Sequence, residues 1–238
     1  MQFLDLTLAS LAENLALDEA LLLDAEAGGG GEVLRLWEWP RPAVVLGAAC
    51  RLAEDVDQAA CVLDGVPMLR RASGGGTVLL GRGCLLYSLV LAYDTAPALT
   101  EIRPSYRYVL ERLRDALTDP AHPVELEGVS DLTVAGRKFS GNAQQRKRSF
   151  LLHHGTVLYD FDLGLVGRSL RQPARQPAYR GRREHAAFLI NLPLGPEEIR
   201  QRVRAAWRAA EARVRWPEDV VRRLAADKFS NPDWTQRR

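Results

Sequence analysis

The sequence of 238 residues predicts a single α+β domain. Segments whose apolar residues recur at helical spacing alternate with short apolar or alternating segments that are typical of strands. No internal repeat and no low-complexity linker divides the chain. Hydrophobic residues make up 47% of the chain and charged residues 26%, which is the range of globular proteins that bury a substantial core. One domain is therefore the economical interpretation.

In the first half of the chain, a Leu- and Ala-rich helix is predicted over residues 14–27, where four glycines end it. Residues 32–39 and 43–46 predict two strands joined by a Pro-Arg-Pro turn, and residues 53–63 predict a helix. Two further strands are predicted at 67–71 and 84–93, with a glycine loop between them. Residues 100–118 predict an amphipathic helix that covers one face of the sheet.

In the second half, residues 131–135, 137–145 and 150–158 predict three successive strands that form a meander. Residues 168–183 are rich in Arg, Gln and Pro and predict a long surface loop. Helices opened by proline are predicted at 196–214 and 217–226, and residues 217–238 form a C-terminal helix and tail.

Composition excludes several classes of function. The 32 basic and 30 acidic residues give a net charge of +2, so no global field attracts nucleic acid or an anionic membrane. The three cysteines, at positions 50, 61 and 84, have neither disulfide-framework nor zinc-site spacing, and we expect no metal site. The first 27 residues carry no basic leader, and no apolar run is long enough to span a bilayer, so we expect a cytoplasmic protein.

Residues 70–77 read Arg-Arg-Ala-Ser-Gly-Gly-Gly-Thr. Three glycines let the backbone bring its N–H groups close to an anion. The guanidinium groups of the two arginines can form bidentate hydrogen bonds with a phosphate or carboxylate. A flexible hairpin loop with solvated arginines is the competing interpretation. The segment is neither a P-loop nor a dinucleotide fingerprint, because both of those spacings are absent.

Residues 130–144 carry Lys138 within Gly-Arg-Lys-Phe-Ser-Gly-Asn-Ala-Gln, and residues 153–156 read His-His-Gly-Thr. Strand alternation predicts that Lys138, Ser140 and Asn142 share one face, with Phe139 and Gly141 on the other. A strand lysine is more often a solvated surface residue. Adjacent histidines on a strand point to opposite faces, which favours structural roles for them.

Together these segments resemble the lipoate-protein ligase family. Its members carry Arg-Arg-x-Ser-Gly-Gly-Gly, then Asp-Leu followed by Arg-Lys-x-Ser-Gly-x-Ala, then His-His-Gly-Thr. Residues 70–76, 131–132, 137–143 and 153–156 match these motifs in order, and residues 14–20 look like the family's first helix. The resemblance spans residues 14 to about 192 and is far more specific as a combination than in any one piece.

The resemblance implies a mixed sheet flanked by helices, with the cleft of biotin and lipoate ligases. It implies that lipoate or octanoate reacts with ATP and Mg²⁺ to give acyl-AMP, and that a lysine of a lipoyl carrier domain then takes the acyl group. The carrier would be of the 2-oxoacid dehydrogenase E2 or glycine-cleavage H protein type. Lys138 matches the lysine that contacts the acyl carboxylate and the α-phosphate, where an ammonium stabilises developing charge.

The other residues that the resemblance assigns to ATP and acyl-adenylate binding lie in three clusters. They are Arg70, Arg71, Ser73, Gly74, Gly75, Gly76, Thr77, Val78 and Leu79 in and after the glycine loop, Asp131, Ser140, Gly141 and Ala143 around the lysine, and His154, Gly155 and Thr156 on the next strand.

Two departures from the family pattern keep alternatives open. Residues 77–84 lack the His-Asp pair that many ligases carry after their glycines. Residues 228–234 resemble the stretch that leads into the accessory C-terminal domain of longer ligases, and the sequence printed above ends there. We therefore expect that adenylation either needs no such domain or uses one from a separate subunit.

A cysteine-dependent octanoyl- or lipoyltransferase of the same fold, which needs no ATP, is the main competitor. Such enzymes place their nucleophile before the Gly-Arg-Lys segment or in the loop after the last strands, and residues 120–130 and 162–183 contain no cysteine. The ligase is therefore favoured over the transferase. A non-catalytic module that binds lipoyl groups or a partner is the third possibility.

The arginines of residues 168–183 suggest docking of an acidic carrier or closure over the nucleotide, beside a plain solvated loop. If they dock the carrier, reversing Arg180 and Arg182 to Glu weakens transfer more than adenylation.

Overall fold

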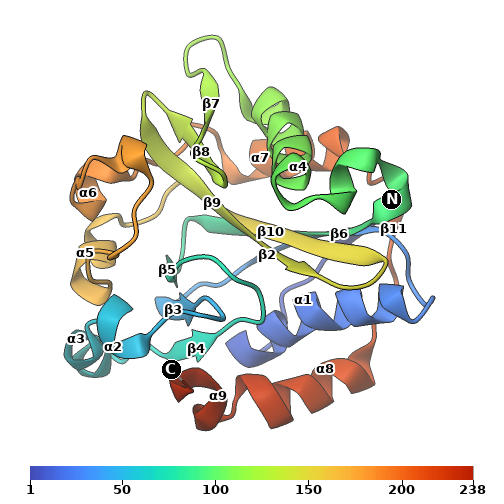
Figure 1. Cartoon of the computed structure of the whole chain (residues 1–238), viewed down its shortest axis with the longest axis horizontal. Helices are drawn as coiled ribbons and strands as arrows, with labels where there is room; N and C mark the ends of the chain where they lie inside the picture. The colour runs from blue at the N-terminus through green and yellow to red at the C-terminus, as the bar shows by residue number, and fades with distance from the viewer. Residues whose placement is uncertain (238) are drawn as a thin grey trace.

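A mixed sheet of eight strands forms the centre of the molecule in a computed structural model that describes residues 1–237 (Figure 1). Its strands lie in the order β11 (Glu211–Ala212), β1 (Gln2–Asp5), β2 (Val33–Glu38), β6 (Cys84–Ala92), β10 (Phe150–Leu158), β9 (Arg137–Arg146), β8 (Asp131–Val134) and β7 (Val124–Glu127). β1 runs parallel to both of its neighbours, and the remaining pairs are antiparallel.

Long helices cover both faces of this sheet (Figure 1). On one face, α1 (Leu11–Glu26) packs with α8 (Glu218–Leu224), and on the other α4 (Ile102–Leu117) packs with α7 (Pro196–Ala206). Each face buries its own hydrophobic core. α1 begins at Ser10 because this side chain and that of Glu13 form a capping box. The arrangement confirms the predicted mixed sheet flanked by helices.

A second sheet of three strands holds the glycine loop. Its central strand β3 (Ala43–Leu46) pairs in parallel with β4 (Met68–Arg70) and in antiparallel with β5 (Val78–Leu80). The glycine loop connects β4 to β5. The loop therefore lies between two fixed strand ends. The sequence placed it between strands at 67–71 and 84–93, and it did not predict the intervening strand β5.

The meander predicted around Lys138 is present as β8, β9 and β10. Ala135 and Gly136, both with positive φ, make the tight turn between β8 and β9. Central strand β10 pairs on its other side with β6 along its full length. This places the histidine segment in the middle of the sheet.

The shorter elements connect these parts. They are α2 (Leu52–Asp55), α3 (Gln58–Leu63), α5 (Gly164–Ser169), α6 (His185–Phe188) and α9 (Pro232–Gln236), the 3₁₀ turns η1 (Tyr93–Thr95), η2 (Pro97–Thr100) and η3 (Ala178–Arg180), and a π-helical turn, η4 (Ala225–Phe229). No helix within residues 1–237 has the length and apolar character of a membrane span.

One prediction in the first half of the chain was wrong. Residues 53–63 form two helices because Val56 bridges to Leu170 and the Asp57 side chain caps α3 by accepting from the Ala60 N–H at 3.0 Å. The two strands predicted within residues 32–46 are present as β2 and β3, but they belong to different sheets. β2 is paired on both sides by β1 and β6, and the chain leaves through Pro40 and Pro42 into the smaller sheet.

Three predictions in the second half need correction. The predicted surface loop at residues 168–183 contains a helical turn and the end of α5. The helix predicted over 196–214 ends at Ala206, because Arg208 takes a positive φ of 48° and the chain then forms edge strand β11. Helix α8 continues through η4 as far as Phe229, beyond the predicted end at residue 226.

Candidate active site

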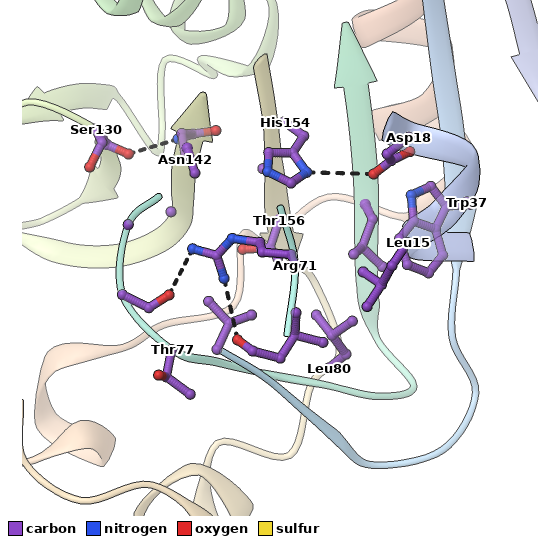
Figure 2. Close-up of a pocket in the computed structure, with 18 of the residues that line it drawn as sticks. Leu15, Asp18, Trp37, Arg71, Thr77, Leu80, Ser130, Asn142, His154 and Thr156 are labelled. Atoms are coloured by element: carbon purple, nitrogen blue, oxygen red, sulfur yellow. Dashed lines mark hydrogen bonds and ion pairs between the residues drawn. The ribbon is translucent and has the colours of Figure 1, made fainter. Parts of the chain in front are cut away.

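A pocket lies where α1, the middle of the large sheet and the glycine loop meet (Figure 2). Its empty space is about 700 Å³, including the open mouth. Its large apolar lining residues are Leu15, Trp37, Val45, Leu80 and Leu86. Figure 2 shows Leu15, Trp37 and Leu80 gathered at one side, while Ser130 and Asn142 lie at the other. Such a slot with one polar end suits an amphipathic acid.

Arg71 organises the glycine loop from within. Its guanidinium donates to the carbonyl oxygens of Gly74 at 2.6 Å and Gly76 at 2.8 Å and to the Ser73 hydroxyl at 3.0 Å. Burial lowers the pKa of Arg71 from 12.5 to about 10, so the side chain stays charged at neutral pH. The guanidinium therefore shapes the loop, with most of its donors already used.

Gly47, at the end of β3, packs directly against this loop. A β-carbon at position 47 would overlap the carbonyl oxygen of Gly75, which itself has a φ of 81°. The Ala48 N–H also donates to the Ser73 carbonyl at 2.8 Å. The sequence reasoning missed Gly47 because a single glycine after a strand carries no motif.

Arg70 faces away from the pocket, towards the C-terminal segment. It is fully buried and donates to the carbonyl oxygens of Gly47 at 2.9 Å, Cys50 at 2.6 Å and Thr235 at 2.7 Å. The indole N–H of Trp234 donates back to the Arg70 carbonyl at 2.8 Å. Arg70 thus supports the loop through these backbone contacts and does not line the pocket, which differs from its predicted role in binding ATP or acyl-adenylate.

Lys138 reaches the pocket beside Asp131. Its Nζ lies 2.7 Å from Asp131 Oδ1, and the Asp131 side chain is only 8% exposed. The strand pairing slips between Leu132 and Thr133, which is a bulge in the β8–β9 ladder. The predicted alternation therefore fails here. The amine of Lys138 lies over Gly141, where an added β-carbon would come within 2.7 Å of Nζ.

The adjacent histidines point to opposite faces, as predicted from the strand. His154 lines the pocket, with Nε2 2.5 Å from the Ser73 hydroxyl and Nδ1 3.5 Å from Asp18. Asp18 is buried and pairs with buried Arg35 at 2.7 Å, so an unbroken chain of polar contacts joins α1 to the glycine loop.

His153 lies in the opposite core between two tyrosines. Its ring stacks on Tyr87 and meets Tyr106 edge-on. Burial lowers the pKa of His153 to about 3, so the imidazole is neutral at physiological pH. His153 is a structural residue of the core and makes no contact with the pocket.

The predicted site residues divide into two groups. Those that line the pocket are Arg71, Gly75, Gly76, Thr77, Val78, Lys138, Gly141, Ala143, His154, Gly155 and Thr156. The others lie outside the lining. Ser73, Gly74, Asp131 and Ser140 each make a polar contact with a lining residue, and the apolar side chain of Leu79 makes none. Leu79 belongs to the core because it faces away from the pocket on β5.

Sequence reasoning missed part of the lining. The unassigned residues are Leu15, Asp18, Trp37, Val45, Leu80, Leu86, Ser130 and Asn142. Asp18 had a detectable signal, because an acid on the apolar face of a helix is unusual unless it is paired. Asn142 lies in the motif itself, where it accepts from the Tyr87 hydroxyl and donates to the Ser130 carbonyl at 2.8 Å.

None of the three cysteines lines the pocket. Cys84 and Cys61 are buried, and burial raises the pKa of both thiols. Cys50 is partly exposed behind the glycine loop, where its thiol lies 3.4 Å from the Gly75 carbonyl. Burial and nearby Asp55 raise the pKa of Cys50 as well. No group of acids, histidines and cysteines within residues 1–237 forms a metal cluster.

The model of the lipoyl protein ligase A/B catalytic domain matches residues 10–204. The chain belongs to this family of lipoate ligases and acyltransferases. It is 33% identical over 186 residues to octanoyltransferase LipM of Carboxydothermus hydrogenoformans, covering 71% of this chain and 69% of that protein.

Solved structures of the family share the fold. A bi-partite lipoate protein ligase from Thermoplasma acidophilum, described with its E2 lipoyl domain, superposes with a TM-score of 0.77 at 22% identity, covering 99% of this chain and 95% of that one. Lipoate-protein ligase A bound with ATP gives a TM-score of 0.77 at 23% identity, covering 99% and 98%. Family membership makes this chain an enzyme of the ligase and transferase group.

Proposed function

We propose that this chain is a lipoate-protein ligase that activates lipoate or octanoate with MgATP. The observation that carries the proposal is the Lys138–Asp131 pair at the polar end of an apolar slot whose lining contains no cysteine. The acyl chain would lie against Leu15, Trp37 and Leu86, which places its carboxylate towards Lys138. An enzyme that activates its acid with ATP has no need of a thiol.

The proposed first step joins two anions. The acyl carboxylate attacks the α-phosphorus of ATP, an acyl–phosphate bond forms, and pyrophosphate leaves. The Lys138 ammonium offsets the repulsion between the two anions and stabilises charge on the oxygens in the transition state. Asp131 holds the amine in place, and Gly76, Thr77 and Val78 at the loop face the nucleotide.

In the proposed second step the neutral amine of a carrier lysine attacks the acyl carbon. An amide bond forms, AMP leaves with the electron pair of the broken bond, and the amine loses a proton. A lipoyl carrier domain of the E2 or H-protein type is the proposed acceptor, in keeping with the E2 lipoyl domain described for the Thermoplasma ligase. An assay of the isolated chain will show whether a separate accessory subunit is needed.

An octanoyltransferase that uses no ATP is the second candidate, favoured by the names of the curated relatives. Its acyl donor would be an octanoyl thioester on one carrier protein and its acceptor a lysine on another. The thiol to test is Cys50, because Cys84 is fully buried within the sheet.

Two assays separate the candidates. We expect ATP-dependent pyrophosphate release with octanoate or lipoate, unaffected by Cys50→Ser. Transfer from an octanoyl carrier without ATP, abolished by Cys50→Ser, would show a thiol-dependent transferase. Transfer without ATP that survives Cys50→Ser would show direct attack of the acceptor lysine on the thioester. Neither activity, in the presence of acyl binding, would indicate a binding module.

A further inference from the structure

The arginine-rich segment of residues 171–184 is tied to the strand turn that precedes Lys138. Arg183 donates to the carbonyl oxygen of Gly136 in that turn and to that of Tyr179, each at 2.9 Å. Arg180 is buried and donates to Gln172 at 2.9 Å and to the Arg183 carbonyl at 3.1 Å. A charge reversal at Arg180 would disrupt this packing, so the combined reversal of Arg180 and Arg182 cannot report on carrier docking.

Tyr179 extends this connection into the site. Its hydroxyl donates to Asp131 Oδ2 at 2.8 Å, while the other carboxylate oxygen, Oδ1, contacts Lys138 Nζ at 2.7 Å. One carboxylate thus bridges the tyrosine and the lysine. Burial and the charge of Asp131 raise the pKa of Tyr179, so its hydroxyl keeps the proton that it donates.

The ring of Tyr179 has a separate packing role. It lies 5.3 Å from the Phe188 ring, and its edge approaches Gly128 at the end of β7. The hydroxyl and the ring therefore make distinct contacts, and a change to phenylalanine removes only the first.

We propose that Tyr179 is a positioning residue that fixes Lys138 through Asp131. With both carboxylate oxygens engaged, Asp131 has one orientation and presents Oδ1 to the amine. Without the hydroxyl, the carboxylate rotates and the amine loses its fixed place over Gly141. Transition-state stabilisation by a charge depends on such preorganisation. This inference rests on the proposed role of Lys138 and adds the segment of residues 171–184 as its support.

A double-mutant cycle tests the bridge. Tyr179→Phe should lower kcat for acyl-AMP formation on the order of 10-fold, with KM for the acid nearly unchanged, because the lost interaction matters in the transition state. In an Asp131→Asn background the same change should cost less than about 2-fold, since the bridge is already broken. The same cycle can be measured without turnover, from the affinity of each variant for octanoyl-sulfamoyl adenosine, an analogue of the acyl-adenylate.

Tyr159→Phe is the matched control. The Tyr159 hydroxyl donates to Glu38 at 2.8 Å, and neither residue lines the pocket, so this variant should keep the wild-type rate. Full activity of Tyr179→Phe would overturn the inference. Losses that multiply in the double variant would also overturn it, because they show that the hydroxyl acts independently of Asp131.

If the proposed ligase function is wrong, the variants give a different set of results. If Lys138→Ala keeps full activity, the role of the lysine is wrong, whatever Tyr179 does. If the wild type transfers octanoate without ATP and needs Lys138, the ligase proposal fails and the same cycle is measured on that reaction. A lysine that is essential in either reaction, together with a silent Tyr179→Phe, contradicts only the positioning inference.

Discussion

At the scale of single residues, two neighbouring side chains in one motif have unrelated tasks. His154 faces the pocket and contacts Ser73, whereas His153 is sealed in the core on the far side of the sheet. Alternation along β10 predicted this division, because successive side chains point to opposite faces. Alternation failed at Lys138, where the bulge in the β8–β9 ladder was invisible in the sequence. Strand periodicity thus predicts side-chain direction only where the ladder is regular.

Burial of His153 predicts sensitivity to acid. The pKa of His153 falls from 6.5 to about 3 on folding, so the unfolded chain binds the proton more readily. This contribution to stability is present above pH 6.5 and is lost as pH falls towards 3. We expect His153→Asn to flatten the dependence of unfolding free energy on pH in this window by up to about 1.4 kcal/mol per pH unit.

Urea unfolding at several pH values measures this slope. His122→Asn is the matched control, because it makes the same substitution at an exposed histidine in a turn. An unaltered slope in His153→Asn would contradict the assignment of a buried neutral imidazole.

At the scale of elements, the glycine loop is held by its neighbours on three sides. Arg71 fills it from within, Ser73 is bonded to His154 on β10, and Gly47 at the end of β3 lets the loop approach closely. The sequence motif predicted a loop that binds an anion, but it assigned both arginines to the ligand. The structure separates them, because consecutive residues at a strand end point in opposite directions.

Gly47→Ala tests this contact. The added methyl group would overlap the Gly75 carbonyl, so the loop must shift away from β3. We expect acyl-AMP formation to fall on the order of 10-fold, with a loss of stability of about 1–3 kcal/mol. Gly167→Ala is the control, because a β-carbon there meets no atom within 4 Å. Wild-type turnover by Gly47→Ala would show that the loop does not depend on this approach.

At the scale of the whole molecule, residues far apart in sequence complete the site. The C-terminal segment reaches back to the glycine loop, where Thr235 accepts from Arg70 and Lys228 pairs with Glu19 of α1 at 2.7 Å. Local patterns predicted most helices and strands and the order of the motifs. They did not predict that two sheets and α1 enclose the slot, because contacts such as Asp18–His154 join segments that share no local signal.

The proposed ligase activity depends most on Lys138, whose amine is 2.7 Å from Asp131 in the pocket. The direct measurement is acyl-AMP formed from MgATP and octanoate, quantified by mass spectrometry, in the wild type, Lys138→Ala and Lys147→Ala. Lys147 is exposed in the β9–β10 turn, so Lys147→Ala is the control variant that also removes one lysine. We expect Lys147→Ala to match the wild type and Lys138→Ala to lose activity by about 100-fold or more, the scale of a removed transition-state charge contact. Wild-type levels of acyl-AMP from Lys138→Ala would contradict the account.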